Sequence, residues 1–109
     1  MANDTLNALY ETILSRKEEK REGSYTCYLF EQGIDKILKK VGEECTETII
    51  AAKNQDNEAL TGELADLLYH LTVMMVERNL PMEALLAELE QRTKKTGNLK
   101  KFKTVDKNS

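Results

Sequence analysis

Apolar residues recur along the chain at the three- and four-residue spacing of helices. The first such segment follows Asp4, a good N-cap residue, and fades in the charged run that ends at Gly23. A short second helix, 25–32, is expected between Ser24 and Gly33. Three further helices are predicted at 34–53, about 58–78, and from Pro81 to about residue 92.

The same spacing predicts which side chains face the core. In the segment 34–53 the inward positions are Ile34, Ile37, Leu38, Val41, Cys45, Thr48, Ile49 and Ala52. In the two later segments they are Leu60, Leu64, Leu67, Leu68, Leu71, Met74 and Met75, then Leu85, Leu86 and Leu89. The short loop between 34–53 and 58–78 makes these helices antiparallel neighbours. We therefore predict an all-α, multi-helix bundle with an antiparallel central helix pair.

Two pairs of acidic residues lie beside these apolar stripes. The stretch KKVGEECTE contains Glu44 and Glu47, and the stretch ELADLLYH contains Glu63 and Asp66. At about 100° per residue, each pair falls at or next to the edge of its apolar stripe, whereas Glu43 points nearly opposite. Antiparallel packing would then bring four carboxylates together.

Carboxylates crowded in a partly buried place repel one another unless a cation neutralises them. Oxygen ligands suit Mg²⁺ or Mn²⁺, and Mg²⁺ commonly takes substrate phosphates as further ligands. The alternative is that these acids are ordinary solvated helix charges. His70, the sole histidine, suits a hydrogen bond to Asp66 or to a substrate better than metal ligation. Neither a Ser-His-Asp arrangement nor a zinc pattern is present in the sequence.

Length and composition set further limits. The 109 residues fit one domain with a small core, so pairing with a second copy is expected, burying apolar surface from the first, fourth or fifth predicted helix. No apolar run is long enough to span a membrane, and no signal-peptide pattern is present. Cys27 and Cys45 form no CxxC pair, which favours a reduced, cytoplasmic protein.

Charge is distributed unevenly along the chain. Residues 1–91 carry nine basic and eighteen acidic residues, whereas seven basic residues and one acidic residue follow from Arg92. An acidic body argues against nucleic acid as a partner. We expect a domain at 1–92 and a basic flexible tail at 93–109 that assists the capture of an anionic ligand.

The two acidic motifs resemble the Glu-x-x-Glu and Glu-x-x-Asp pattern of the all-α, MazG-like nucleoside triphosphate pyrophosphohydrolases. A narrower similarity, over roughly 6–92, is to the phosphoribosyl-ATP pyrophosphohydrolase family of histidine biosynthesis. It rests on SYT before a short helix, on the run GIDKILKKVGEE and on ADLLYH.

The resemblance implies that phosphoribosyl-ATP and water yield phosphoribosyl-AMP and pyrophosphate, in a helical homodimer with its site near the subunit interface. It implies metal ligation by Glu44, Glu47, Glu63 and Asp66, with Glu43 in a supporting or water-positioning role. Substrate contacts are expected from Ser24, Tyr25, Thr26, Lys36, Lys39, Lys40 and His70.

Two other functions remain open. One is a MazG-like pyrophosphatase that acts on canonical or damaged nucleoside triphosphates. The other is a non-enzymatic helical dimerisation module whose acids are merely solvated.

Overall fold

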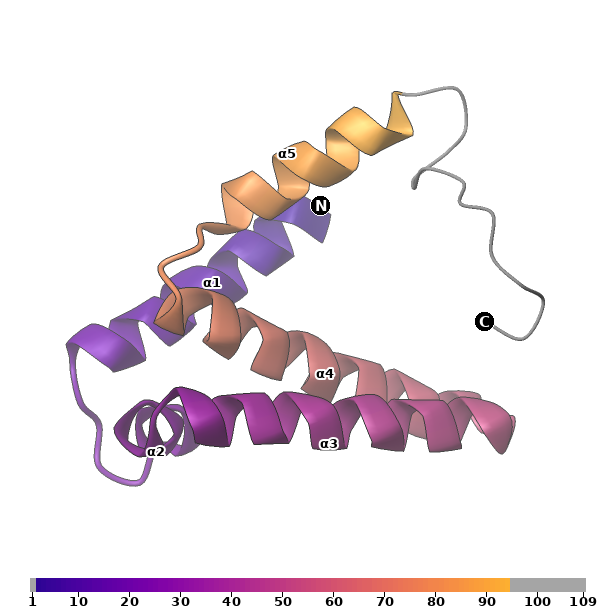
Figure 1. The fold of residues 1–109 in the computed structure, drawn as a ribbon, viewed down its shortest axis with the longest axis horizontal. Helices are drawn as coiled ribbons and strands as arrows, with labels where there is room; N and C mark the ends of the chain where they lie inside the picture. The colour runs from indigo at the N-terminus through magenta and orange to yellow at the C-terminus, as the bar shows by residue number, and fades with distance from the viewer. Residues whose placement is uncertain (1, 95–109) are drawn as a thin grey trace.

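A computed structural model describes residues 2–94, which form five helices and no strand (Figure 1). The helices are α1 (Ala2–Glu18), α2 (Tyr25–Gln32), α3 (Ile34–Lys53), α4 (Asn57–Glu77) and α5 (Met82–Thr93). The all-α prediction is confirmed. The predicted cap at Asp4 is wrong, because α1 begins at Ala2 and Asp4 lies in its first turn. The predicted tail at 93–109 overlaps α5 by one residue, and its part from 95 onward lies outside the described residues.

Local residue chemistry explains where the middle helices begin and end. The Ser24 hydroxyl accepts a hydrogen bond from the backbone N–H of Cys27 and caps α2. Gly33, at φ 91°, ends α2 and starts α3 in a conformation that glycine adopts without strain, so the two helices join at a steep angle (Figure 1). After α3, Asp56 caps α4 by accepting from the backbone N–H of Ala59 at 3.0 Å.

The antiparallel pair α3 and α4 is the centre of the fold, as predicted (Figure 1). The hydrophobic core lies at one end of this pair, where α1 and α2 pack against it. It consists of Ile13, Leu29, Ile37, Val73 and Val76, with Leu9, Tyr10, Leu14, Phe30, Tyr69 and Met74 around them. The other end of the pair projects beyond α1 and α2 as a two-helix hairpin (Figure 1).

The predicted inward faces of the central pair are therefore wrong in part. Leu38 and Ile49 on α3 are 47% and 67% exposed, and Leu64 and Leu68 on α4 are 43% and 48% exposed. The residues of α3 that are buried are Ile37, Glu44 and Ala51, seven residues apart. The side of α3 that faces α4 is thus centred on Glu44. The apolar stripe that contains Leu38 and Ile49 lies beside this side and is exposed. No third helix of the described residues covers that stripe. The predicted inward side chains of α5 are also partly outside the core, since Leu85 and Leu89 are 40% and 44% exposed.

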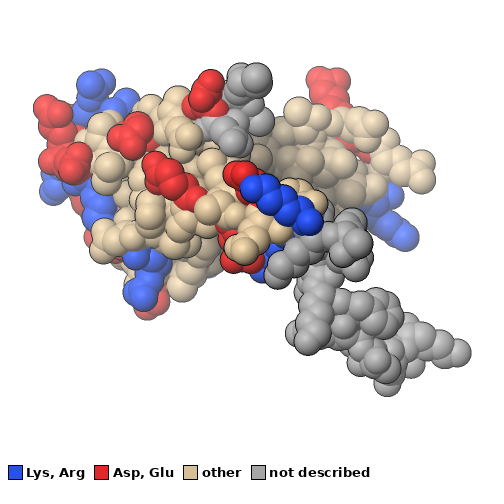
Figure 2. Space-filling view, turned by 90° about the horizontal axis from the view of Figure 1, so that it is seen from above, with Lys and Arg blue, Asp and Glu red and all other residues tan. Residues whose placement is uncertain are grey.

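The described surface carries both signs of charge. On the face shown in Figure 2, acidic side chains are spread across the surface, and basic side chains gather mainly toward one end. Among the described helices, none is long and apolar enough to cross a membrane.

Candidate active site

The antiparallel packing of α3 and α4 brings acidic side chains from both helices together. One carboxylate oxygen from each of Glu44, Glu63 and Asp66 lies within 4.8 Å of the others. Glu47, one turn after Glu44, contacts the Glu63 carboxyl group. Glu44, Glu63 and Asp66, with Glu47 beside Glu63, form what we call the acidic cluster. The predicted convergence of the two edges is confirmed for the first three acids, and Glu47 joins them through Glu63.

The cluster contains buried acceptor oxygens without donors. Glu44 is 6% exposed, and its Oε2 has no hydrogen-bond partner among residues 2–94. Oε2 of Glu63 is buried and lacks a partner in the same way. A hydrogen bond with Glu47, together with burial and the charges of Glu47, Glu44 and Asp66, raises the pKa of Glu63 from 4.5 to about 6. Orphaned carboxylate oxygens that repel one another are the environment that a hard divalent cation stabilises, so the cluster fits Mg²⁺ or Mn²⁺.

Lys40 supplies positive charge at the edge of the cluster. Its Nζ lies 3.3 Å from Oε1 of Glu43 and 3.8 Å from Oε1 of Glu44. Burial disfavours the ammonium, but the hydrogen bond to Glu43 and the nearby charges outweigh it and raise the pKa of Lys40. Lys40 is therefore a cation at neutral pH. Glu43 itself is exposed and touches the cluster only through Lys40, in agreement with its predicted outward angle.

His70 joins the cluster to α2. Its Nδ1 lies 2.8 Å from the backbone carbonyl oxygen of Asp66, and its Nε2 lies 2.9 Å from the hydroxyl of Tyr25. Because a carbonyl only accepts, Nδ1 of the neutral ring carries the hydrogen, and Tyr25 donates to Nε2. His70 is 5% exposed. The predicted hydrogen bond to Asp66 is confirmed; it is made to the backbone carbonyl and holds the ring beside the cluster.

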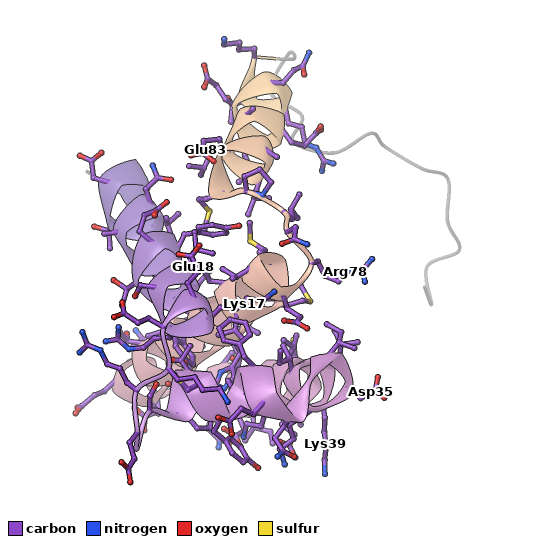
Figure 3. All side chains as sticks on the ribbon, turned by 90° about the vertical axis from the view of Figure 1, so that its left-hand side faces the viewer. Lys17, Glu18, Asp35, Lys39, Arg78 and Glu83 are labelled. Carbon is purple, nitrogen blue, oxygen red and sulfur yellow. The ribbon has the colours of Figure 1, made fainter. Side chains whose placement is uncertain are left out.

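The other predicted substrate-binding residues are Ser24, Thr26, Lys36 and Lys39, and they differ in what their side chains contact. The Ser24 hydroxyl is used as the α2 cap, and the Thr26 hydroxyl shares a hydrogen bond with the Tyr69 hydroxyl. Nζ of Lys36 lies 5.9 Å from the ring centre of Tyr28. Lys39 is exposed and points away from the helix pair (Figure 3), so the structure does not bring it to the cluster.

Two residues that support the cluster were not singled out from the sequence. Thr48 was assigned to the apolar stripe, but its hydroxyl donates to the backbone carbonyl of Glu44 at 2.7 Å and lies 3.4 Å from that of Glu63. Tyr69 places its ring edge-on to His70 at 4.9 Å between ring centres. A threonine four residues after Glu44 on the same helix was the available signal for the first. Tyr69 directly precedes His70 on α4, whereas its contacts with Thr26 and Tyr25 depend on how α2 packs, which spacing does not reveal.

The raised pKa of Glu63 leads to a test on the metal-free protein. Its folded-state pKa lies above the ordinary value, so ionised Glu63 destabilises the fold above about pH 6, and that penalty disappears as pH falls toward 4.5. We expect Glu63→Gln to melt at a higher temperature than the parent chain at pH 8, and the difference to shrink below about pH 6 and to vanish below about pH 4. Thermal unfolding in a chelator across this range measures it. Glu18→Gln, at an exposed position of α1, is the control. A difference that does not change with pH would contradict the expectation.

Comparison with known proteins identifies the family of the chain. Residues 6–93 match the family model described as phosphoribosyl-ATP pyrophosphohydrolase. A phosphoribosyl-ATP pyrophosphatase of Listeria welshimeri is 55% identical over 101 residues, covering 93% of this chain and 97% of that protein. Proteins of the same name from Clostridium novyi and Clostridium botulinum are 55% and 51% identical, over 89% and 96% of this chain and 88% and 96% of their own lengths. The chain, with its four acids on an antiparallel helix pair, therefore belongs to the phosphoribosyl-ATP pyrophosphohydrolase family.

Proposed function

We propose that this protein hydrolyses the α–β phosphoanhydride of phosphoribosyl-ATP, giving phosphoribosyl-AMP and pyrophosphate, the second step of histidine biosynthesis. The observation that carries the proposal is the acidic cluster, inside a chain that matches this family along almost all of its length. The family match favours this substrate over the general nucleoside triphosphates of a MazG-like enzyme. A non-enzymatic module would not need buried, unpartnered carboxylates.

Glu44, Glu47, Glu63 and Asp66 are proposed to hold Mg²⁺, with Mn²⁺ as a substitute. The fit rests on the donor set, which is all carboxylate oxygen, and on the two orphaned Oε2 atoms. When bound, the cation would neutralise charge on the triphosphate and activate the attacking water.

The protein's own groups supply the remaining parts of the reaction. Water oxygen attacks the α-phosphorus, the bond to the bridging oxygen breaks, and pyrophosphate leaves. The water proton passes to a carboxylate oxygen of the cluster that the cation leaves free. Lys40, held as a cation beside Glu44, is placed to bind the phosphate oxygens of substrate or product. Glu43 positions the ammonium of Lys40, a supporting role rather than ligation.

Lys36 lies on the same helix one turn before Lys40, and we propose that it also binds the substrate. The assignment of Lys39 is weakened by its outward direction (Figure 3). Ser24 and Thr26 act on the substrate indirectly, because their hydroxyls already hold α2 in place.

The functional unit is proposed to be a homodimer that works in the cytoplasm. The exposed apolar side chains of α3 and α4 form an uncovered stripe, namely Leu38, Ile49, Ile50, Leu64 and Leu68. A second copy of the chain is the occupant that the family resemblance implies. The apolar face of α1 already packs in the core, so α1 is no longer a candidate for the interface.

Both cysteines are free thiols, which is consistent with a reducing compartment such as the cytoplasm. Nucleic acid is not proposed as a partner.

Pyrophosphate release from phosphoribosyl-ATP is the direct test. We expect turnover that requires Mg²⁺, that stops in excess chelator and that returns when Mg²⁺ is restored. In a panel at equal concentrations, ATP and other nucleoside triphosphates should give at least about tenfold lower kcat/KM, because the second phosphoribosyl group offers additional contacts. Equal rates on ATP would favour the MazG-like alternative. The absence of release on every substrate would contradict the proposed enzyme.

A further inference from the structure

Two tyrosines of α2 present their rings to solvent beside the acidic cluster. Tyr25 and Tyr28 are 44% and 42% exposed, although Tyr69 and His70 of α4 contact one side of Tyr25 and Lys36 of α3 lies over Tyr28. Their ring centres are 6.1 Å apart with 26° between the planes, an offset-stacked arrangement. We call these two rings the tyrosine platform. Large exposed aromatic rings on a small protein commonly mark a binding surface.

The platform is held rigidly against the catalytic helices. The Tyr25 hydroxyl donates to His70, and the Tyr25 ring also stacks against Tyr69 with ring centres 6.2 Å apart. The same hydroxyl lies near enough to Lys40 and Glu44 for both charges to influence its pKa. Tyr25 therefore reaches from the acidic cluster to the platform, and a ligand could occupy both at once.

A cavity of about 550 Å³ opens on the platform. Tyr25 and Tyr28 line it together with Cys27 and Glu31 of α2 and with Arg21, Glu22, Gly23 and Ser24 from the preceding turn. This volume is in the range of small-molecule sites. Arg21 makes no ion pair among the described residues, and Nζ of Lys36 lies 5.9 Å from the ring centre of Tyr28. The site thus combines flat aromatic surface with one cation, Arg21, and two acids, Glu22 and Glu31, while Lys36 lies beside the Tyr28 ring.

We propose that the tyrosine platform receives the purine base of the nucleotide, with Tyr28 as a specificity-determining residue. The inference rests on the proposed function for the presence of a nucleotide, and extends it by assigning the base to this cavity. A purine offers a flat π face that stacks on tyrosine, and its phosphates would extend toward Lys40 and the cluster. The Tyr25 and Tyr28 rings are already in contact, so the base lies over the platform rather than between the rings. The competing occupant is a second copy of the chain.

The test compares ligands with and without a base. Binding of α,β-methylene-ATP and of inorganic triphosphate, each with Mg²⁺, is measured by calorimetry for the parent chain, Tyr28→Leu and Tyr28→Phe. We expect Tyr28→Leu to weaken α,β-methylene-ATP about tenfold and to leave inorganic triphosphate unchanged. Tyr28→Phe keeps the ring and should bind both like the parent. Gln32→Ala, exposed on the same helix and outside the cavity lining, is the control.

Kinetics and sedimentation complete the test. With phosphoribosyl-ATP, Tyr28→Leu should raise KM about tenfold with kcat nearly unchanged, because the ring binds substrate and transition state alike. Equal binding of α,β-methylene-ATP by the parent and Tyr28→Leu, or an equal loss for both ligands, would overturn the base assignment. A shift of Tyr28→Leu from dimer to monomer would assign the platform to the subunit interface instead. If the parent releases no pyrophosphate from phosphoribosyl-ATP, the proposed function fails, while the two binding measurements still decide the platform.

Discussion

Replacing one acid of the cluster by its amide should lower kcat by more than about 100-fold while the helical fold survives. Glu44→Gln, Glu47→Gln and Asp66→Asn each remove one anionic ligand and nearly preserve side-chain shape. Losing even an outer partner of a metal site typically costs 10–100-fold, so losing a direct ligand should cost more. Steady-state pyrophosphate release measures kcat, and circular dichroism confirms the fold.

The matched control is Glu43→Gln, on the same helix and adjacent in sequence. Glu43 is exposed and contacts the cluster only through Lys40, so its amide should cost no more than about tenfold. Thermal unfolding supplies a second measurement: Mg²⁺ should raise the melting temperature of the parent chain and of Glu43→Gln, and raise it less in the three amides. Parent-like turnover in Glu47→Gln and Asp66→Asn would refute the ligand set.

Helix positions could be predicted from the sequence because their start and stop signals are local. Ser24 and Gly33 bound α2, and the predicted range 34–53 is the range of α3, since caps and glycines act within one turn. At the start of α1 the same reasoning placed a cap at Asp4, although the helix begins at Ala2. Asp4 lies instead within the first turn, a difference of the size by which helix ends commonly vary.

The side of each helix that is buried was harder to predict, because it depends on which neighbours exist. Spacing places Ile49 on an apolar stripe, but no other helix within residues 2–94 covers that stripe, and Ile49 is 67% exposed. The face toward α4 carries Glu44 instead, which is 6% exposed. Hydrophobic periodicity identifies surface that needs covering without stating whether the same chain covers it.

The acidic cluster could be predicted because it needs only two helices and one antiparallel turn. Its surroundings could not. The bond between Tyr25 and His70 joins residues 45 positions apart, and it depends on the angle at which α2 leaves Gly33. Thr26 and Tyr69, 43 positions apart, meet for the same reason.

A lysine introduced into the uncovered apolar stripe of α3 and α4 should dissociate the proposed dimer, and turnover should be lost with the dimer. Ile49→Lys on α3 and Leu68→Lys on α4 place an ammonium at positions that are exposed in a single chain, so each chain should still fold. Burying an unpaired charge in an interface costs several kcal/mol, which weakens self-association by more than about 100-fold. Sedimentation at micromolar protein should then show one 12.4 kDa chain rather than two. Pyrophosphate release should fall with the dimer fraction.

Leu89→Lys is the control that distinguishes the possible interfaces, because Leu89 is 44% exposed but lies on α5, away from the central pair (Figure 1). If the dimer forms through α3 and α4, Leu89→Lys sediments as a dimer and keeps its activity. If Leu89→Lys dissociates while Ile49→Lys does not, the interface lies on α5 and the stripe on the central pair has another role. An active monomer of Leu68→Lys would mean that one chain completes the site alone.

The dependence of turnover on protein concentration distinguishes loss of the dimer from loss of a metal ligand. A substitution that acts only by weakening the dimer regains turnover as protein concentration rises, whereas Glu44→Gln, which removes a ligand, does not.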